Sequence, residues 1–297
     1  MLFRSPTWQA ATGQDSLLSV AIADNVVYVG GHQKWMNAIQ SGSDEQAGQV
    51  PRPGLAALDP QNGIPLTWNP GRHPRGIGAE ELLATDNGVY VGSDTEYIGN
   101  GEYRRARLAF FPVEGGTAPV TQADPVLPRS LYRLSANTVT TRQFSGTSIT
   151  TPTTVTTTGG ANWNNVRGAF MIGSKLVYGA TDNKLHYRTF DGTAFGPDNV
   201  IDPYNDPYWS NVTTSGGTQT YRGRVPNLYG QLSNVTGMAY ADGRLYYTRS
   251  LQGKVFWRWF SPQSLIVGAA EFTVASSNFP LLQDVRNLVY ADGQLWA

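Results

Sequence analysis

The chain has 297 residues, with 22 basic and 22 acidic side chains, three histidines and no cysteine. The balanced charge gives no electrostatic footprint for nucleic acid or an anionic membrane, and the lack of cysteine excludes disulfides, thiolate zinc sites and cysteine nucleophiles. No apolar run approaches the roughly 18 residues of a membrane span. Eight tryptophans, 15 tyrosines, 33 glycines and 18 prolines are typical of many short strands joined by tight turns.

Five segments of the chain repeat one pattern, in which an apolar strand, a two-residue turn and an aromatic-containing strand follow one another. In chain order they are residues 17–30, 79–92, 166–179, 235–248 and 285–297. The dipeptides Asn87-Gly88, Asp242-Gly243 and Asp292-Gly293 favour hairpin turns, because both central residues of such turns adopt positive φ. The segments alternate with a period of two and lack a sustained period of 3.6. The pattern therefore predicts five β-hairpins.

A second similarity predicts a sixth unit. Residues 131–150 align without gaps to residues 177–196, so that Arg142–Thr147 matches Arg188–Thr193. Arg258–Ser261 resembles the same segment, which we interpret as an outer hairpin. The inner strands of the sixth unit fall within residues 117–130.

These repeats predict an all-β chain that forms one domain over residues 1–297. We expect a β-propeller of about five to six four-stranded blades, since radial packing closes the sheet edges into a ring. The chain stops midway through a blade at Ala297, and residues 2–8 resemble the missing outer strand. The N- and C-terminal strands are therefore predicted to share a blade and close the ring. The alternative is a fragment of a longer array.

One segment carries a family resemblance. Gly54–Trp68 resembles the A-x-D-x-x-T-G-x-x-x-W signature of quinoprotein propellers, with Asp59 and Gly63 in the turn. With Val27–Gly31, it is similar to secreted actinobacterial repeat proteins described as PQQ-like or kelch-like. The resemblance implies a propeller in which Trp68 docks between neighbouring blades, an extracellular location, and a place in a larger secreted chain. Asp191–Gly196 is similar to hairpins of sugar-binding propeller lectins.

Three kinds of chemistry have candidate residues. Glu80 and Glu81 are the acidic pair for glycoside hydrolysis, but adjacent strand residues point to opposite faces and cannot form the required pair with each other. Quinone redox chemistry rests on the one signature at Trp68. The docking role of this tryptophan explains the signature without a cofactor. Calcium has oxygen ligands in two loops, where ordinary turn geometry is the competing interpretation. These are Asp94, Glu96, Asn100 and Glu102 in one loop, and Asp202, Asn205 and Asp206 in the other.

Aligning the hairpins predicts a ligand site. One position in each first strand is occupied by Leu18, Glu80, Arg167, Thr236 and Arg286, and the position two residues earlier by Ser16, Gly78, Asn165, Asn234 and Asp284. If these strands lie toward the axis, the polar side chains ring one end of the central channel. Polar groups in apolar strands must be hydrated, paired with another polar group, or used to bind a ligand. The ring therefore serves either a polar ligand or a structural ion-pair plug.

Loop aromatics offer a further surface for a sugar ring, or else cap blade edges. They are Trp35, Trp163, Tyr208 and Trp209. We take Glu80, Arg167, Thr236, Arg286, Asn165, Asn234, Asp284 and Trp163 as the predicted ligand-binding residues, with no catalytic residue, metal ligand or cofactor. The chain is interpreted as a non-catalytic binding or scaffold module for carbohydrate or another polar ligand. The alternatives are a glycoside hydrolase or quinoprotein oxidoreductase, and a structural spacer.

Overall fold

The computed structural model describes residues 5–40, 45–112, 118–120, 122–214, 217–274 and 285–297. Every described regular element is a β-strand or a short 3₁₀ helix, and the strands pair antiparallel except for β6 with β9. This confirms the all-β prediction. None of the described helices is long and apolar enough to cross a membrane.

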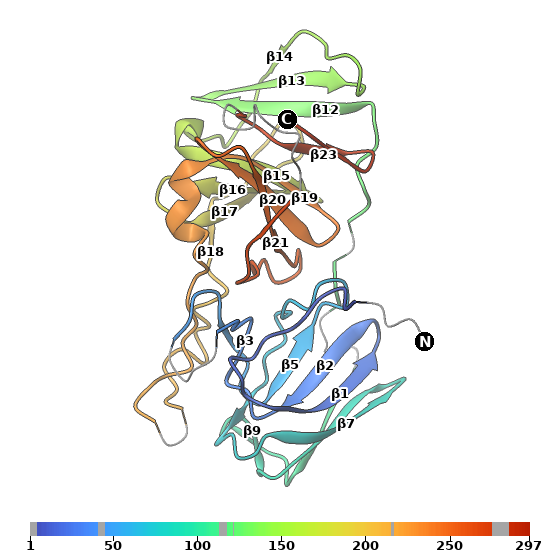
Figure 1. The fold of residues 1–297 in the computed structure, drawn as a ribbon, viewed down its shortest axis with the longest axis vertical. Coiled ribbons are helices and arrows are strands. Elements are labelled where there is room, and N and C mark those ends of the chain that lie inside the picture. The colour runs from blue at the N-terminus through green and yellow to red at the C-terminus, as the bar shows by residue number, and fades with distance from the viewer. Residues whose placement is uncertain (1–4, 41–44, 113–117, 121, 215–216, 275–284) are drawn as a thin grey trace. The chain divides into compact units, whose positions relative to one another are not determined.

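The chain divides into two compact units, each of which contains three stretches of sequence (Figure 1). Unit 1 comprises residues 1–121, 202–227 and 258–270, and unit 2 comprises residues 122–201, 228–257 and 271–297. The single domain, the number of blades and the closure of the ring stay predictions. Residues 2–4 of the proposed closing strand lie outside the described residues, while Trp8 donates its indole N–H to the carbonyl of Pro60 in unit 1, at 2.8 Å.

Unit 1 contains two larger antiparallel sheets, in the orders β1-β2-β5 and β11-β8-β7, and two smaller ones, β3-β4 and β10-β9-β6. Its strands are β1 (Leu17–Ala23), β2 (Val26–Gly31), β3 (Trp35–Met36), β4 (Val50–Pro51), β5 (Leu55–Leu58), β6 (Arg72–His73), β7 (Ala79–Thr85), β8 (Gly88–Ser93), β9 (Tyr97–Asn100), β10 (Tyr103–Arg104) and β11 (Leu108–Pro112).

Unit 2 contains two four-stranded meanders, β15-β16-β17-β18 and β19-β20-β21-β22, which have the strand order expected of propeller blades. The other two sheets are β12-β13-β14 and β23-β24. The elements are β12 (Arg129–Ser135), β13 (Thr138–Phe144), β14 (Thr153–Val155), η2 (Trp163–Asn165), β15 (Val166–Ile172), β16 (Lys175–Ala180), β17 (Leu185–Thr189), β18 (Asn199–Ile201), η3 (Tyr229–Asn234), β19 (Val235–Ala241), β20 (Arg244–Arg249), β21 (Val255–Trp259), β22 (Phe272–Thr273), β23 (Val289–Ala291) and β24 (Gln294–Trp296).

The five predicted hairpins are present, and one of their turns differs from the prediction. Asp242-Gly243 and Asp292-Gly293 have positive φ and connect β19 to β20 and β23 to β24 as expected. The β7–β8 turn was placed one residue too late, because Thr85 pairs with Gly88 and the turn residues are Asp86 and Asn87. Gly88 is a strand residue with φ 147°, and a Cβ there would lie 2.1 Å from the carbonyl oxygen of Phe111. Close approach of β11 explains this glycine.

The outer hairpins are confirmed as well. Phe144 bridges Ile149, Phe190 bridges Phe195, and Phe260 bridges Val267, each across a short turn. Leu58 makes the same bridge to Pro65 in the segment that carries the quinoprotein signature. The Leu58 and Phe260 bridges join residues seven positions apart, whereas the Phe144 and Phe190 bridges join residues five apart, so the signature shares its turn with the Phe260 hairpin.

Consecutive sheets pack through their first strands within each unit. In unit 1 β1 contacts β7, and in unit 2 β15 contacts β19, which contacts β23. The approach in unit 2 is close, because a Cβ on Gly168 would lie 2.6 Å from Cγ of Met238, and one on Gly237 would lie 2.7 Å from the carbonyl carbon of Asn287. β15, β19 and β23 therefore form one continuous row.

Candidate functional site

A β-bulge marks the aligned position in four of the five hairpins. Pairing shifts around Leu18 in β1, Glu80 in β7, Arg167 in β15 and Thr236 in β19. These four residues were aligned from sequence alone, so the predicted register is confirmed. A bulge adds a residue to one strand and redirects its side chain, and bulges are frequent beside binding sites.

Unit 2 brings three of the predicted residues onto neighbouring segments. Arg167 and Thr236 occupy the bulges of adjoining β15 and β19, and the exposed Arg286 comes three residues before β23. Arg167 is half-buried and donates to the carbonyls of Asn164 (2.8 Å) and Val166 (2.9 Å). The Thr236 hydroxyl lies 2.9 Å from that of Thr248. We call Arg167, Thr236 and Arg286 the bulge row.

Two asparagines extend this row. Asn165 ends η2 and Asn234 ends η3, and the side chains of both are exposed. Their main-chain carbonyls accept the N–H groups of Thr181 (2.9 Å) and Ser250 (2.8 Å), which fixes each turn against the end of a second strand. Asp284 lies outside the described residues.

Trp163 is a core residue and offers no ring face to a ligand. Its side chain is only 4% exposed and packs against Tyr178 and Phe195, with ring centroids 6.1 and 4.8 Å away. Burial of a large aromatic surface explains this position. Trp35 and Trp209 are buried in the same way, whereas Tyr208 is 37% exposed.

Glu80 and Glu81 lie in unit 1 and are exposed on β7. Glu81 borders an open hollow of about 350 Å³, whose other lining residues are Leu83, Tyr90, Gly92 and Leu108. The lining therefore supplies one carboxylate, whereas a glycosidase site needs two. The joint arrangement of Glu80 with Arg167 and Arg286 stays a prediction.

The quinoprotein-like segment has the docking geometry that the resemblance implied. The Trp68 ring makes edge contacts with Tyr28 of β2 (5.3 Å) and Phe111 of β11 (5.0 Å), so it packs between the two larger sheets of unit 1. Asp59 is buried and accepts from the Ser261 hydroxyl at 3.1 Å. Burial raises the pKa of Asp59, and the bonds from the main chain of Gln61 and from Ser261 oppose that rise.

The acidic loops are explained by main-chain bonds. Asp94 accepts the N–H groups of Ile77 (2.8 Å) and Gly78 (3.3 Å). Asp206 accepts those of Tyr208 (2.9 Å) and Trp209 (3.2 Å). Among the described residues, no group of three or more histidine, aspartate or glutamate side chains could hold a metal ion.

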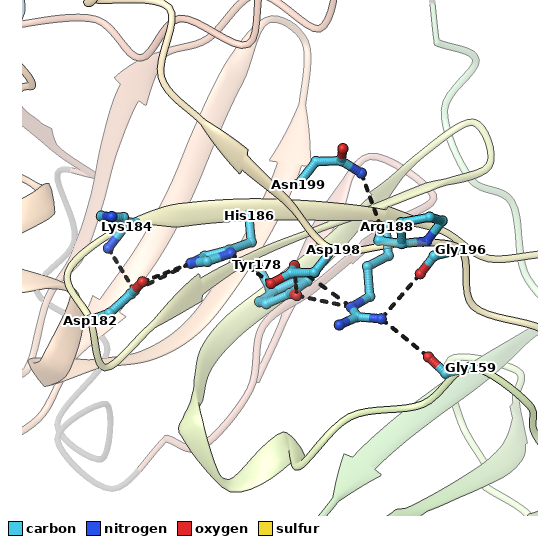
Figure 2. Close-up of polar contacts among 10 residues, drawn as sticks. Gly159, Tyr178, Asp182, Lys184, His186, Arg188, Gly196, Asp198 and Asn199 are labelled. Atoms are coloured by element: carbon cyan, nitrogen blue, oxygen red, sulfur yellow. Dashed lines mark hydrogen bonds and ion pairs between the residues drawn. The ribbon is translucent and has the colours of Figure 1, made fainter.

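Sequence reasoning missed a polar cluster in unit 2 around His186, shown in Figure 2. The imidazole is 7% exposed and lies between two carboxylates, with Nε2 3.1 Å from Oδ2 of Asp182 and Nδ1 3.2 Å from Oδ2 of Asp198. It stacks on Tyr178 at 5.4 Å. A neutral imidazole carries one N–H, so only the protonated ring can donate to both carboxylates at once.

The cluster continues from Asp198 to the edge of the sheet. The Tyr178 hydroxyl donates to Asp198, and Arg188 donates to the Tyr178 hydroxyl at 3.2 Å. Arg188 also donates to the carbonyls of Gly159 and Gly196, each at 3.1 Å (Figure 2). Burial and the bond to Asp198 raise the pKa of Tyr178 to about 12. The cluster thus ties the β16–β17 turn, the start of β18 and a neighbouring loop together.

The sequence held one signal for this cluster. Tyr178 and His186 are directly paired on β16 and β17, so hairpin register places their side chains on the same face. Asp182 lies in the turn between those strands, within the local reach of His186.

Comparisons with known proteins give no family. No family model matches the chain, and no curated protein matches it. Solved structures that resemble it include a nidogen–laminin complex, at 12% identity over 94% of this chain and 86% of the other, with a TM-score of 0.26. BamB from Moraxella catarrhalis has 13% identity over 98% and 82%, with a TM-score of 0.20. The designed Ika4 protein has 11% identity over 86% and 99%, with a TM-score of 0.21.

Proposed function

We propose that the chain is a non-catalytic binding module and that the bulge row of unit 2 is its ligand-binding surface. The observation that carries this proposal is the coincidence of polar residues with aligned bulges on adjoining strands. An irregularity repeated at one register position of β15 and β19, with a polar side chain at both, suits a surface that contacts a ligand.

The chemistry of the row favours a polar ligand. Arg167 and Arg286 supply guanidinium donors, Thr236 supplies a hydroxyl, and the exposed amides of Asn165 and Asn234 supply both donors and acceptors. Hydroxyl groups and carboxylates of a carbohydrate match such a set, and planar guanidinium groups bind carboxylates through paired hydrogen bonds. We therefore propose a carbohydrate, and an extracellular surface as its source.

A glycan array followed by calorimetry tests this function. We expect the wild type to bind at least one glycan class and Arg286→Ala to weaken that binding by about tenfold, as loss of a charged hydrogen-bond donor implies. Arg286 is preferred to Arg167 because Arg167 also holds main-chain carbonyls.

The matched control is Arg133→Ala, which removes an exposed arginine from β12 of the same unit. Its affinity should equal that of the wild type. The absence of a binding signal on the array and in calorimetry would contradict carbohydrate binding. Equal losses of affinity in both variants would show a general charge effect instead of a site.

A further inference from the structure

Two exposed tyrosines from distant parts of the sequence lie side by side in unit 1. Tyr103 begins β10 and is 54% exposed, and Tyr208 is 37% exposed in the segment 202–227. Both flank Gly99 of β9, where a Cβ would lie 2.8 Å from Oη of Tyr208 and 3.7 Å from Cδ2 of Tyr103. The glycine therefore leaves no side chain between the Tyr208 hydroxyl and the edge of the Tyr103 ring.

Tyr208 is held in place before any ligand arrives. Its hydroxyl accepts the N–H of Asn100 at 2.7 Å, and its own N–H donates to Asp206 at 2.9 Å. The fully buried Trp209 packs against its ring edge, with centroids 5.0 Å apart. A fixed aromatic ring loses little conformational entropy on binding, which is the advantage of preorganisation.

Charged side chains lie around the two tyrosines. The Arg105 guanidinium lies 5.8 Å from the centre of the Tyr103 ring, and Arg104 donates to Glu96 at 3.2 Å. Burial raises the pKa of Tyr208, and the nearby carboxylate of Glu102 raises it further. Three carboxylates (Glu96, Glu102 and Asp206) and two guanidiniums (Arg104 and Arg105) thus lie near the pair, so an anionic ligand gains no advantage there.

We infer that Tyr103 and Tyr208 form a platform that binds a neutral saccharide. The apolar C–H face of a pyranose ring packs on aromatic faces, while its hydroxyl groups hydrogen-bond to the charged side chains at the rim. The buried tryptophans cannot serve in this way, because their faces are covered. This site belongs to unit 1 and is independent of the bulge row.

Titration of the full chain with cellohexaose, xylohexaose and laminarihexaose, monitored by calorimetry and saturation-transfer NMR, tests the platform. Concentrations up to about 10 mM capture millimolar affinities. We expect at least one neutral hexaose to bind, and Tyr103→Ala to weaken it by about tenfold or more. Tyr208→Phe keeps the ring and should stay within about threefold of the wild type.

Tyr132→Ala is the matched control, since Tyr132 is a tyrosine of unit 2 with 45% exposure, against 54% for Tyr103. It should leave the affinity unchanged, and circular dichroism should show all variants folded. Absence of binding by every neutral hexaose, or equal affinity in the wild type and Tyr103→Ala, would overturn the platform. Loss on Arg286→Ala with retention on Tyr103→Ala would overturn it while supporting the bulge row.

Discussion

At the scale of single residues, the position of His186 needs only a flat ring that stacks on the neighbouring tyrosine. In the neighbouring meander Phe256 stacks on Tyr247 at 5.7 Å, much as His186 stacks on Tyr178 at 5.4 Å. Both tyrosine hydroxyls donate to an acid immediately before the fourth strand of the sheet, Asp198 before β18 and Glu271 before β22. The histidine therefore adds two carboxylate contacts to an arrangement that phenylalanine also satisfies.

This comparison predicts different costs for two substitutions at His186. His186→Ala removes a buried ring and should lower the free energy of unfolding by about 2 kcal/mol. His186→Phe keeps the stacking and loses only contacts to half-exposed carboxylates, so it should cost less than about 1 kcal/mol. Urea unfolding at neutral pH measures both. Equal costs would show that the polar contacts, and not the ring, stabilise the cluster.

Tyr178 gives a prediction in alkaline solution. Its pKa is raised to about 12 by burial and by Asp198, above the ordinary value near 10. The protonated phenol is therefore favoured by the folded state, and its contribution is complete below about pH 10 and lost as pH rises towards 12. Tyr178→Phe should lose less stability than the wild type over that range, as measured by urea unfolding. Tyr187→Phe, on the next strand, should behave like the wild type.

The sequence predicted some of these residues and not others. Leu18, Glu80, Arg167 and Thr236 could be aligned because each precedes a hairpin with a recognisable turn, and local pairing then fixes the register. His186 was missed because Asp198 reaches it from another strand, twelve residues along the chain. The proximity of Tyr103 and Tyr208 could not be predicted, since no local sequence pattern relates residues that are 105 positions apart.

At the scale of elements, the repeated outer turn accounts for much of unit 1. The turn after Leu58 and the turn after Phe260 have matching hydrogen bonds, and they contact each other through Asp59 with Ser261. Gly63 (φ 73°) and Leu265 (φ 58°) occupy the same left-handed position in the two turns. A signature that resembles a cofactor family thus has a structural role in this chain.

This equivalence predicts unequal costs for substitutions at the two positions. Gly63→Ala should destabilise by about 1–2 kcal/mol or more, because left-handed φ is strained for alanine and the new Cβ would lie 2.4 Å from Cε3 of Trp8. Leu265→Gly removes a strained leucine and should cost less than Gly63→Ala. Thermal melting of both variants measures the difference. A larger loss in Leu265→Gly would mean that its side-chain packing outweighs the backbone strain.

At the scale of the whole molecule, unit 1 depends on segments from the second half of the chain. Trp209 is fully buried and donates to the carbonyl of Asn69 at 3.2 Å. The Asn37 amide donates to the carbonyl of Val267 at 3.0 Å and accepts the N–H of Ala269 at 2.9 Å. The repeats predicted the sheets but not these associations, because neither segment 202–227 nor the outer hairpin in 258–270 carries a sequence signal for the residues that it contacts in the first half of the chain.

The interleaving predicts that residues 1–121 do not fold alone. Without Trp209 and Phe260 the fragment exposes surfaces that these side chains cover, and it leaves Asn37 and Asp59 without their partners. We expect no cooperative thermal transition and weak near-ultraviolet circular dichroism, in contrast to the full chain. A fragment of residues 1–121 that melts cooperatively would show that the late segments are dispensable.

The same interleaving sets an order of events during synthesis. Unit 1 begins at the N-terminus, yet it is complete only when residue 270 has left the ribosome. Roughly 150 further residues must be translated after residue 121, which takes about 10–30 s at ordinary elongation rates. During that interval the early hairpins hold apolar surface open to water, so a holding chaperone should increase the yield of this protein more than that of one whose first half folds by itself.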